Sequence, residues 1–283
     1  MKRSPLALFL TAGLVLCSAS AARTAGRAGR RSPLQLTFVA NAGVLVSVGE
    51  RRALIDALFD KPNPEYRAPA PDVLDKIMKG DPPYDDVDLV LVTHNHPDHF
   101  DPSLAVRYLE SVPGPTLVAP ADAVAEMRKV AAEWAKIAPR VVALDMRIRE
   151  TASRDLGRIR IKAFRTLHSG GGESPMNIMY LFDLGGWRVL HEGDSPGKVD
   201  EYRAFGLGRE PVDLALVHFW FPLEPNCARF LREVLKPGHI ALTHLPIRLE
   251  SDAPGKIDQV RKDYDDLFLL LPGMKPKVFR KDG

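Results

Sequence analysis

The sequence predicts one layered α/β domain over residues 34–283, and three observations predict it. Short runs that are apolar, or that alternate apolar and polar residues, have the length of β-strands, as in Leu89 to Val92. These runs alternate with stretches whose apolar residues recur at helical spacing, as in Ala121 to Ile137. Hydrophobic residues make up 45% and charged residues 27% of the chain, as in soluble globular proteins, and no linker or repeat divides the region.

The N-terminus predicts a targeting segment. Lys2 and Arg3 precede an apolar run over residues 6–16, which is too short to span a bilayer. Ala19-Ser20-Ala21 then supplies the small residues of a cleavage site. We therefore expect a signal peptide over residues 1–21, with an uncleaved anchor or a first helix as the alternative. The mature protein is expected to be periplasmic or secreted, without stable insertion in the membrane.

Residues 22–33 are rich in Ala, Arg, Gly and Ser and predict a flexible leader. Cleavage would lower the net charge from +3 to +1, because the signal holds two basic residues and no acidic one. A nearly neutral protein has no bulk attraction to nucleic acid, so we expect none as a partner. A small-molecule substrate is the expected partner, and the sequence leaves the oligomeric state open.

The two cysteines do not predict a disulfide. Cys17 lies within the signal, where the bulky Leu16 argues against lipid attachment because a small residue is expected before a lipidated cysteine. Cys227 is then the single cysteine of the mature chain and has no internal partner. We expect it to be a half-buried helix residue rather than a catalytic thiol.

The first half of the domain predicts strands and helices in alternation. Asn41-Ala42-Gly43 and Gly49-Glu50 are turn sequences between the first β-patterned runs. Asp101 and Pro102 are typical of a helix N-cap and first turn. The expected strands are 34–39, 44–48, 52–56, 89–92, 116–119 and 141–144; the expected helices are 72–79, 103–109 and 121–137, with an irregular loop over 61–71.

The second half returns to β-patterned runs and ends in a helix. Gly185-Gly186 marks a hairpin turn between two of the strands. The expected strands are 158–164, 176–182, 187–190, 212–217 and 239–243, and the expected helices are 226–235 and 257–271.

Three histidines and an aspartate stand within six residues directly after the apolar run 89–92. His94, His96, Asp98 and His99 form the pattern His-x-His-x-Asp-His. Imidazole and carboxylate are the ligands that borderline divalent metals such as zinc prefer. In a tight loop the first two histidines can face one metal, while the aspartate and the last histidine face a second one. A solvated polar turn is the alternative, but this density of histidine favours a metal site.

Further polar residues follow other predicted strands, namely His168, Asp194, His218 and His244. Strands that end at one edge of a sheet sandwich would bring them to the loop of 94–99. A single histidine at a strand end is more often structural than a ligand, but four such loops together favour a site.

Three further residues are candidates around this cluster, and two of them keep two interpretations each. Asp56 ends the third strand and either orients a metal-facing histidine or caps a turn. His218 either binds substrate or acts as an acid, or else makes a structural hydrogen bond. Trp220 should border the pocket, together with Phe59, Tyr66, Phe219 and Phe221, which would make the pocket partly apolar.

Three pieces of this sequence, in this order, resemble the metallo-β-lactamase superfamily over residues 34–250. Thr93 to His99 is similar to the family's signature, which is highly specific. His191 to Ser195 looks like its Gly-Asp loop, and Thr243 to Pro246 looks like its last histidine loop. The resemblance implies a four-layer αβ/βα sandwich with a two-metal site, usually zinc, at one edge.

The resemblance also implies which side chains bind metal. It assigns one metal to His94, His96 and His168, the other to Asp98, His99 and His244, and makes Asp194 a bridge between them. Two zinc ions per chain are implied, with manganese or iron as alternatives.

One departure bears on the branch of the superfamily. Many relatives carry a Gly-His-Thr-Pro-Gly-like third loop, whereas this chain has Leu167-His168-Ser169-Gly170. With Asp194 after a strand–Gly-Gly–strand hairpin, the chain looks more like the branch of L-ascorbate-6-phosphate lactonase and N-acyl-phosphatidylethanolamine phospholipase D. His168 is the implied ligand that fits the common pattern least.

The activity expected from the resemblance is metal-dependent hydrolysis by an exported enzyme. Hydroxide generated at the two metals would attack an ester, lactone, amide or phosphodiester, with Asp98 and Asp194 as catalytic residues that orient it. Two other functions remain as alternatives, a mononuclear iron oxidoreductase of the same fold and a non-catalytic exported metal-binding protein.

Overall fold

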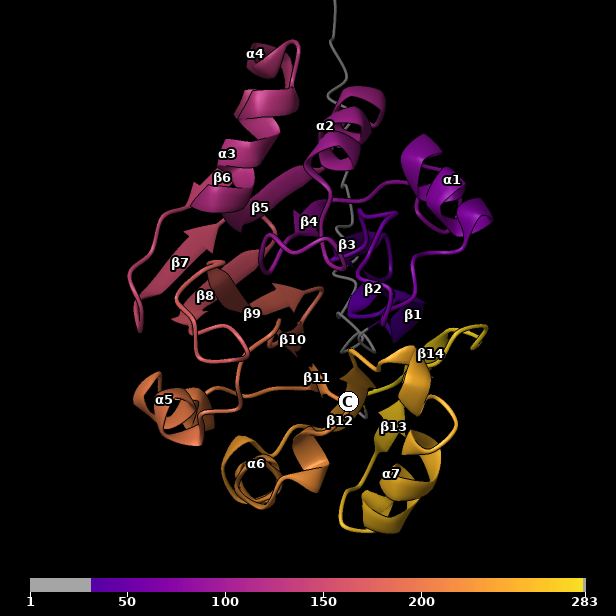
Figure 1. Cartoon of the computed structure of the whole chain (residues 1–283), viewed down its shortest axis with the longest axis vertical. Coiled ribbons are helices and arrows are strands. Elements are labelled where there is room, and N and C mark those ends of the chain that lie inside the picture. Colours follow the sequence, from indigo (N-terminus) through magenta and orange to yellow (C-terminus); the bar gives the residue numbers. More distant parts are fainter. Residues whose placement is uncertain (1–31, 282–283) are drawn as a thin grey trace, which may run out of the picture.

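Two seven-stranded sheets form the centre of the molecule in the computed structural model, which describes residues 32–281 (Figure 1). The first sheet contains, in spatial order, β14 (Lys277–Phe279), β1 (Leu34–Ala40), β2 (Gly43–Val48), β3 (Arg51–Ile55), β4 (Leu89–Leu91), β5 (Thr116–Pro120) and β6 (Val141–Leu144). The second contains β13 (Leu267–Leu269), β12 (His239–Thr243), β11 (Leu214–His218), β10 (Trp187–His191), β9 (Asn177–Leu184), β8 (Arg160–Thr166) and β7 (Thr151–Asp155).

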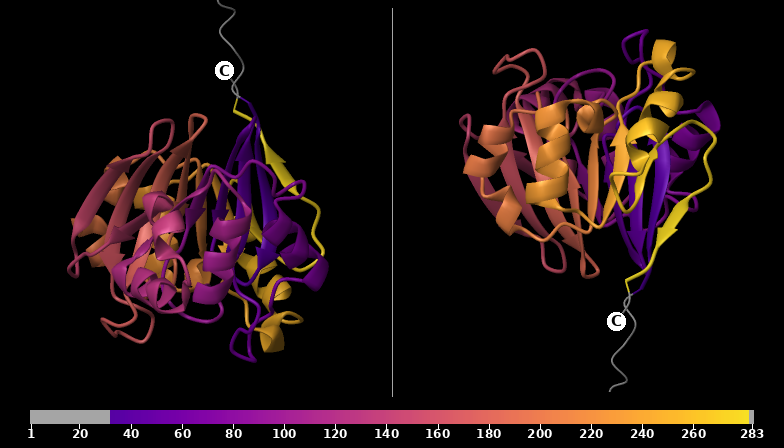
Figure 2. Two further views of the ribbon diagram at one scale, coloured as in Figure 1. Left: turned by 90° about the horizontal axis from the view of Figure 1, so that it is seen from above. Right: turned by 90° about the horizontal axis from the view of Figure 1, so that it is seen from below.

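Helices cover the outer face of each sheet, which gives four layers (Figure 2). The first sheet is covered by α1 (Pro71–Lys79), α2 (Pro102–Ser111), α3 (Ala121–Val130) and α4 (Trp134–Ile137). The second is covered by α5 (Val199–Ala204), α6 (Pro225–Arg229), the π-helical segment η4 (Phe230–Leu235) and α7 (Ala253–Arg261). The αβ/βα sandwich expected from the resemblance is therefore confirmed. Among the described residues, no helix has the length and apolarity needed to cross a membrane.

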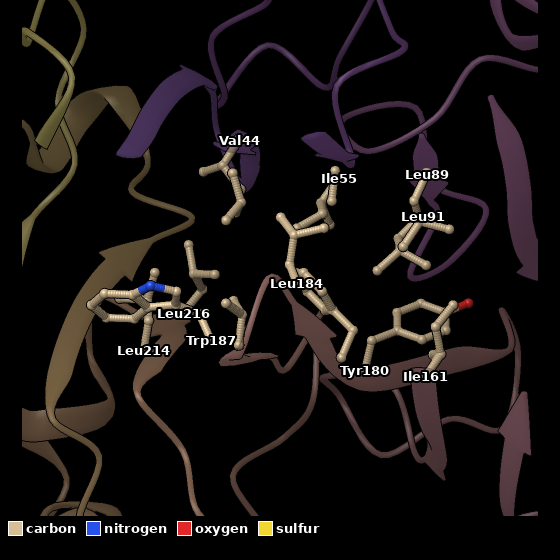
Figure 3. Close-up of a cluster of buried hydrophobic side chains, with 14 of the residues drawn as sticks. Val44, Ile55, Leu89, Leu91, Ile161, Tyr180, Leu184, Trp187, Leu214 and Leu216 are labelled. Carbon is tan, nitrogen blue, oxygen red and sulfur yellow. The ribbon is translucent and has the colours of Figure 1, made fainter. Parts of the chain in front are cut away.

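The main core lies between the sheets. Side chains such as Val44, Ile55 and Leu91 from the first sheet face Tyr180 and Leu216 from the second (Figure 3). The hydroxyl of Tyr180 also donates a 2.9 Å hydrogen bond across this core to the carbonyl of Val92, directly before the histidine loop. Packing of the two sheets therefore fixes the base of that loop.

Strand direction decides where the loops meet. β3, β4, β5 and β6 run parallel in the first sheet, and β10 to β13 run parallel in the second. β8 also points the same way as β10, because both pair antiparallel with β9. The carboxyl ends of β3, β4, β8, β10, β11 and β12 can therefore share one edge of the sandwich.

Two of the expected helices differ in the structure. The helix expected over 121–137 is broken after Val130, where Ala131 adopts an extended conformation, and α4 restarts at Trp134. The break lets Trp134 and Ile137 pack on the same apolar cluster as α3, so tertiary packing overrides a helical pattern.

The helix expected over 257–271 ends at Arg261, and residues 267–269 form β13 instead. The side chains there alternate, since Phe268 packs between the sheets while Leu267 and Leu269 pack on the helices. This period of two fits a strand that pairs with β12, and a short apolar run cannot be assigned from sequence spacing alone.

The sequence pattern also missed two strands at sheet edges. β7 is mostly exposed and β14 has three residues, so neither carries the apolar alternation of a half-buried strand. The expected signal peptide (1–21) and most of the leader (22–33) lie outside the described residues.

Candidate metal centre

Loops from both sheets bring eight imidazole and carboxylate side chains to one edge of the sandwich. His94, His96, Asp98 and His99 follow β4 in the first sheet. From the second sheet come His168 after β8, Asp194 after β10, His218 as the last residue of β11 and His244 after β12. All the ligand positions implied by the resemblance therefore lie in one cluster, and His218 joins them.

The first group of donors contains His94, His96, His168 and Asp194, whose ligand atoms lie within 4.8 Å of one another. Asp194 Oδ2 is 3.7 Å from Nε2 of His94 and 3.4 Å from Nε2 of His168. The rings of His96 and His168 have centroids 4.5 Å apart. Four donor atoms this close together can bind a single divalent ion.

The second group contains Asp98, His99 and His244. Nε2 of His99 and Nε2 of His244 face each other at 3.0 Å, and they lie 3.5 Å and 3.3 Å from Oδ2 of Asp98. The same two nitrogens lie 3.2 Å and 3.1 Å from Oδ1 of Asp194. Asp194 thus presents Oδ2 to the first group and Oδ1 to the second.

These separations fit a metal. Zinc bonds of 2.0–2.1 Å in a tetrahedron place neighbouring donors about 3.3 Å apart, and the donor pairs here are 3.0–3.7 Å apart. Nε2 of His94, Nε2 of His168 and Oδ1 of Asp194 are also buried without a hydrogen-bond partner. Buried polar atoms are almost always paired, so these three need a partner that a cation supplies.

Electrostatics favours the metal-binding forms of two donors, Asp194 and His94. Burial alone would raise the pKa of Asp194, but the facing rings of His244, His99 and His94 outweigh it and hold that pKa well below its ordinary value. Burial and the neighbouring His99 lower the pKa of His94 well below 6.5. A carboxylate and a neutral imidazole are the forms in which these side chains bind metals.

Asp56 contacts the histidine loop at Thr93 and at His99. Its Oδ1 accepts a 2.8 Å hydrogen bond from the backbone N–H of Thr93, and its Oδ2 accepts one of 2.6 Å from the Thr93 hydroxyl. Nδ1 of His99 lies 2.9 Å from the same Oδ2. Of the two interpretations of Asp56, this geometry matches a carboxylate that orients a metal-facing histidine.

Two asparagines that the sequence pattern did not single out position the aspartates. Nδ2 of Asn41 donates to Oδ2 of Asp98 at 2.9 Å and to its backbone carbonyl at 3.1 Å. Oδ1 of Asn177 accepts a 3.0 Å hydrogen bond from the backbone N–H of Asp194. Their turn and strand positions gave no signal, because each contact joins residues far apart in the chain.

Glu192 is a third residue that sequence reasoning missed. Its Oε1 accepts from the backbone N–H of His218 at 2.6 Å and lies 2.9 Å from Nδ1 of the same histidine. Nε2 of His218 lies 3.3 Å from Oδ1 of Asp194. Burial alone lowers the pKa of His218, but Asp194 and Glu192 outweigh it and raise the pKa to about 9.

A pocket of about 450 Å³ opens over the two groups. Tyr66 forms part of its wall, with its ring 4.4 Å from the ring of His244. Trp220 and Phe219 also line it, as expected, whereas Phe59 and Phe221 are buried in the apolar core and do not. The lining is completed by Asn63, Glu65, His96, Asp98, His168, Ser169, Gly170, Asp194, His218, His244, Pro246, Arg248 and Leu249.

Two other residues discussed from the sequence lie apart from the centre. His191 is buried, with Nε2 3.0 Å from the Ala42 carbonyl and Nδ1 accepting from the backbone N–H of Gly193. Cys227 is buried in α6 rather than half-buried, and burial raises the pKa of its thiol. A thiol in that state is a poor nucleophile.

Comparison with known proteins agrees with this architecture. The family described as "Beta-lactamase superfamily domain" matches residues 35–218, well over half of the chain. No curated protein shows a significant match.

Solved structures share the fold at low sequence identity. YhfI from Bacillus subtilis, a metallo-β-lactamase fold protein, aligns with 88% of this chain and 100% of its own, at 16% identity and a TM-score of 0.58. Igni18 from Ignicoccus hospitalis, a metallo hydrolase, aligns with 89% of this chain and 100% of its own, at 16% identity and a TM-score of 0.57. CmlA from Streptomyces venezuelae, a diiron β-hydroxylase, aligns with 89% of this chain but 55% of its own, at 17% identity and a TM-score of 0.52.

The fold and the buried cluster are those of a metal-dependent hydrolase with a site at the edge of two facing sheets. The chain belongs to the metallo-β-lactamase superfamily. The lactonase-like and phospholipase D-like branch stays a prediction.

Proposed function

We propose that the protein is an exported hydrolase that depends on two zinc ions. The observation that carries this proposal is the position of Asp194, whose two carboxylate oxygens each face a different group of histidines. One group has His94, His96 and His168, and the other has Asp98, His99 and His244. Export rests on the predicted signal peptide over residues 1–21.

Two bound divalent ions would lower the pKa of water toward neutrality and stabilise negative charge on a carbonyl or phosphoryl oxygen. Asp194 and Asp98 are placed to orient the attacking water, since both line the pocket beside the donor groups. Asn41 holds Asp98 by its side chain and its backbone, so that carboxylate keeps one direction. A rigid carboxylate contributes through positioning.

The pocket supports a substrate of modest size with an ester, lactone, amide or phosphodiester bond. Tyr66 and Trp220 offer apolar ring surface, while Arg248 brings a cation to the wall. The side chain of Arg248 makes no ion pair or hydrogen bond within the described part of the chain, so its charge is free for an acidic group of a substrate. We therefore favour anionic substrates among these classes.

The first test is elemental analysis of the protein purified without chelator, beside the variant His96→Ala. We expect about two zinc ions per chain in the unaltered protein and close to one in the variant, because His96 belongs to one group only. The control is His239→Ala, since His239 begins β12 at its far end and pairs with Asp266. A screen of esters, lactones and phosphodiesters follows.

Three results would contradict parts of the proposal. No bound metal, even after incubation with zinc, would refute the ligand assignment and the mechanism together. Two zinc ions without hydrolysis of any substrate class would favour the non-catalytic metal-binding protein. An equal loss of metal in His96→Ala and His239→Ala would mean that the cluster is not the site.

Iron is the alternative with an observation in its favour. CmlA carries a diiron site on a similar fold, and imidazole and carboxylate also accept iron. Iron in place of zinc in the purified protein would favour an oxidoreductase, and an oxygen-consumption assay would then replace the hydrolysis screen.

A further inference from the structure

His218 lies between two carboxylates. Its Nδ1 is 2.9 Å from Oε1 of Glu192, and its Nε2 is 3.3 Å from Oδ1 of Asp194. Its side chain is 4% exposed, and those of Glu192 and Asp194 are 2% and 8% exposed. All three side chains are therefore largely shielded from bulk water.

A neutral imidazole ring has too few N–H groups to donate to both carboxylates beside His218. A neutral imidazole has one N–H and one lone pair, and an ionised carboxylate only accepts. When Nδ1 donates to Glu192, the lone pair on Nε2 points at an oxygen of Asp194. That contact is repulsive unless a positive charge lies beside it, either as a second proton or as a cation bound by both atoms.

His191 provides a contrast within the same fold. It is also buried and ends the neighbouring strand, but its partners are one carbonyl, that of Ala42, and one N–H, that of Gly193. A neutral ring satisfies both of them at once. His191 therefore has the partners of a structural histidine, and His218 does not.

The ring of His218 is held so that it cannot turn away. Oε1 of Glu192 accepts from the backbone N–H as well as facing the ring. Oε2 of Glu192 accepts a 3.1 Å hydrogen bond from the hydroxyl of Tyr202, which lies 2.7 Å from Oγ of Ser195. A histidine whose far nitrogen is fixed by a carboxylate is a common arrangement around metals, because it sets the tautomer and the direction of the lone pair.

We propose that His218 is an additional ligand of the cation that Asp194 and His244 bind, with Glu192 as the residue that positions it. The ligand atoms of Asp194, His218 and His244 lie within 4.8 Å of one another. The inference rests on the metal centre proposed above and adds to its second group a donor that the resemblance does not imply.

The test is a cobalt titration of the protein after metal removal, because Co²⁺ replaces zinc and its visible spectrum reports the number and type of ligands. The variants are His218→Ala and Glu192→Gln, with His239→Ala as the control. We expect His218→Ala to weaken binding of one of the two cobalt equivalents by more than the roughly 10–100-fold that loss of an outer partner costs, and to change the visible band of that equivalent. Glu192→Gln should give a smaller change in the same direction.

Glu192→Gln keeps the size of the side chain but removes the negative charge that faces Nδ1 of His218, so this variant tests the proposal if His218→Ala does not fold. Unchanged affinity and spectrum in the variants, with two equivalents bound to the unaltered protein, would overturn the role of His218 and leave the metal centre intact. Failure of the unaltered protein to bind cobalt would overturn both.

Discussion

Two buried carboxylates outside the donor groups each fix one ring at the centre. Asp56 faces Nδ1 of His99, and Glu192 faces Nδ1 of His218, so in both rings Nε2 is left to point at the donor cluster. Asp56 does more, since it also accepts two hydrogen bonds from Thr93 at the start of the loop. A single carboxylate thus couples the backbone of the loop to the direction of a ligand.

Replacing Asp56 with asparagine should weaken metal binding without removing a ligand. An amide nitrogen cannot accept the proton of Nδ1 of His99, so we expect a loss of 10–100-fold in zinc affinity and about 1–3 kcal/mol in the free energy of unfolding. Competition with a chelating dye measures the affinity, and urea denaturation measures the stability.

The matched control is Asp266→Asn, because Asp266 faces Nδ1 of His239 at 2.8 Å in a pair remote from the centre. It should leave zinc affinity unchanged. Equal affinity in Asp56→Asn and the unaltered protein would refute the orienting role of Asp56.

The site residues that the sequence predicts are those marked by close spacing or by a position directly after a strand. Two patterns predict that the donors lie close together. One is the spacing of His94 to His99, and the other is the position of His168, Asp194 and His244 directly after strands. Glu192 and Asn41 carried no such signal, because their partners are 26 and 57 residues away. Phe59 was placed wrongly at the pocket, since an aromatic beside a loop gives no sign of which way it points.

At the scale of elements, the turn after β10 shows how closely the two sheets approach. Gly193 adopts a left-handed conformation with φ of +60°, and a Cβ there would lie 2.6 Å from Oδ1 of Asn177 and 2.8 Å from Cβ of Thr93. The turn that presents Asp194 is therefore packed directly against the histidine loop of the other sheet.

Gly193→Ala should displace this turn and lower metal content, because both contacts are too short to be relieved by a small movement. Gly206→Ala is the control: its φ is +73°, but a Cβ there meets nothing within 4 Å. Both variants carry backbone strain of about 1–2 kcal/mol, and we expect only Gly193→Ala to lose further stability and bound zinc. Thermal unfolding and elemental analysis measure the two effects, and equal behaviour of the variants would contradict the clash.

Helices and strands with a clear apolar period or a capping residue can be predicted from the sequence. Elements whose conformation depends on contacts with distant segments cannot. The capped helix α2 is present as expected, with Asp101 accepting from the backbone N–H of Leu104. The C-terminal helix was predicted too long, because Leu267 to Leu269 is apolar in a way that fits either a helix or a strand. Only contact with β12 decides between them.

At the scale of the whole molecule, the donors connect two halves of the sandwich. His94, His96, Asp98 and His99 belong to the first sheet, and His168, Asp194 and His244 to the second, so each proposed ion would bind ligands from both. Metal binding would then stabilise the arrangement of the sheets as well as the loops.

Removing metal should lower the melting temperature. A ligand at 100 times its Kd stabilises the folded state by about 2.7 kcal/mol, which corresponds to roughly 5–10 °C for a chain of this size. Calorimetry with and without chelator measures the shift, and His96→Ala should show a smaller one. Identical melting curves in zinc and in chelator would mean that the ions do not join the sheets.

The pairing of β1 with β14 has a consequence for how the chain is made. Leu34, Gln35 and Leu36 pair with Phe279, Val278 and Lys277, so within residues 32–281 the first strand is a neighbour of the last. The sheet that contains β1 consequently keeps an open edge until Lys277 to Phe279 have been synthesised. Such distant pairing delays folding, and for a protein exported by the predicted signal peptide this delay would leave time to reach a translocation channel before the sheet closes.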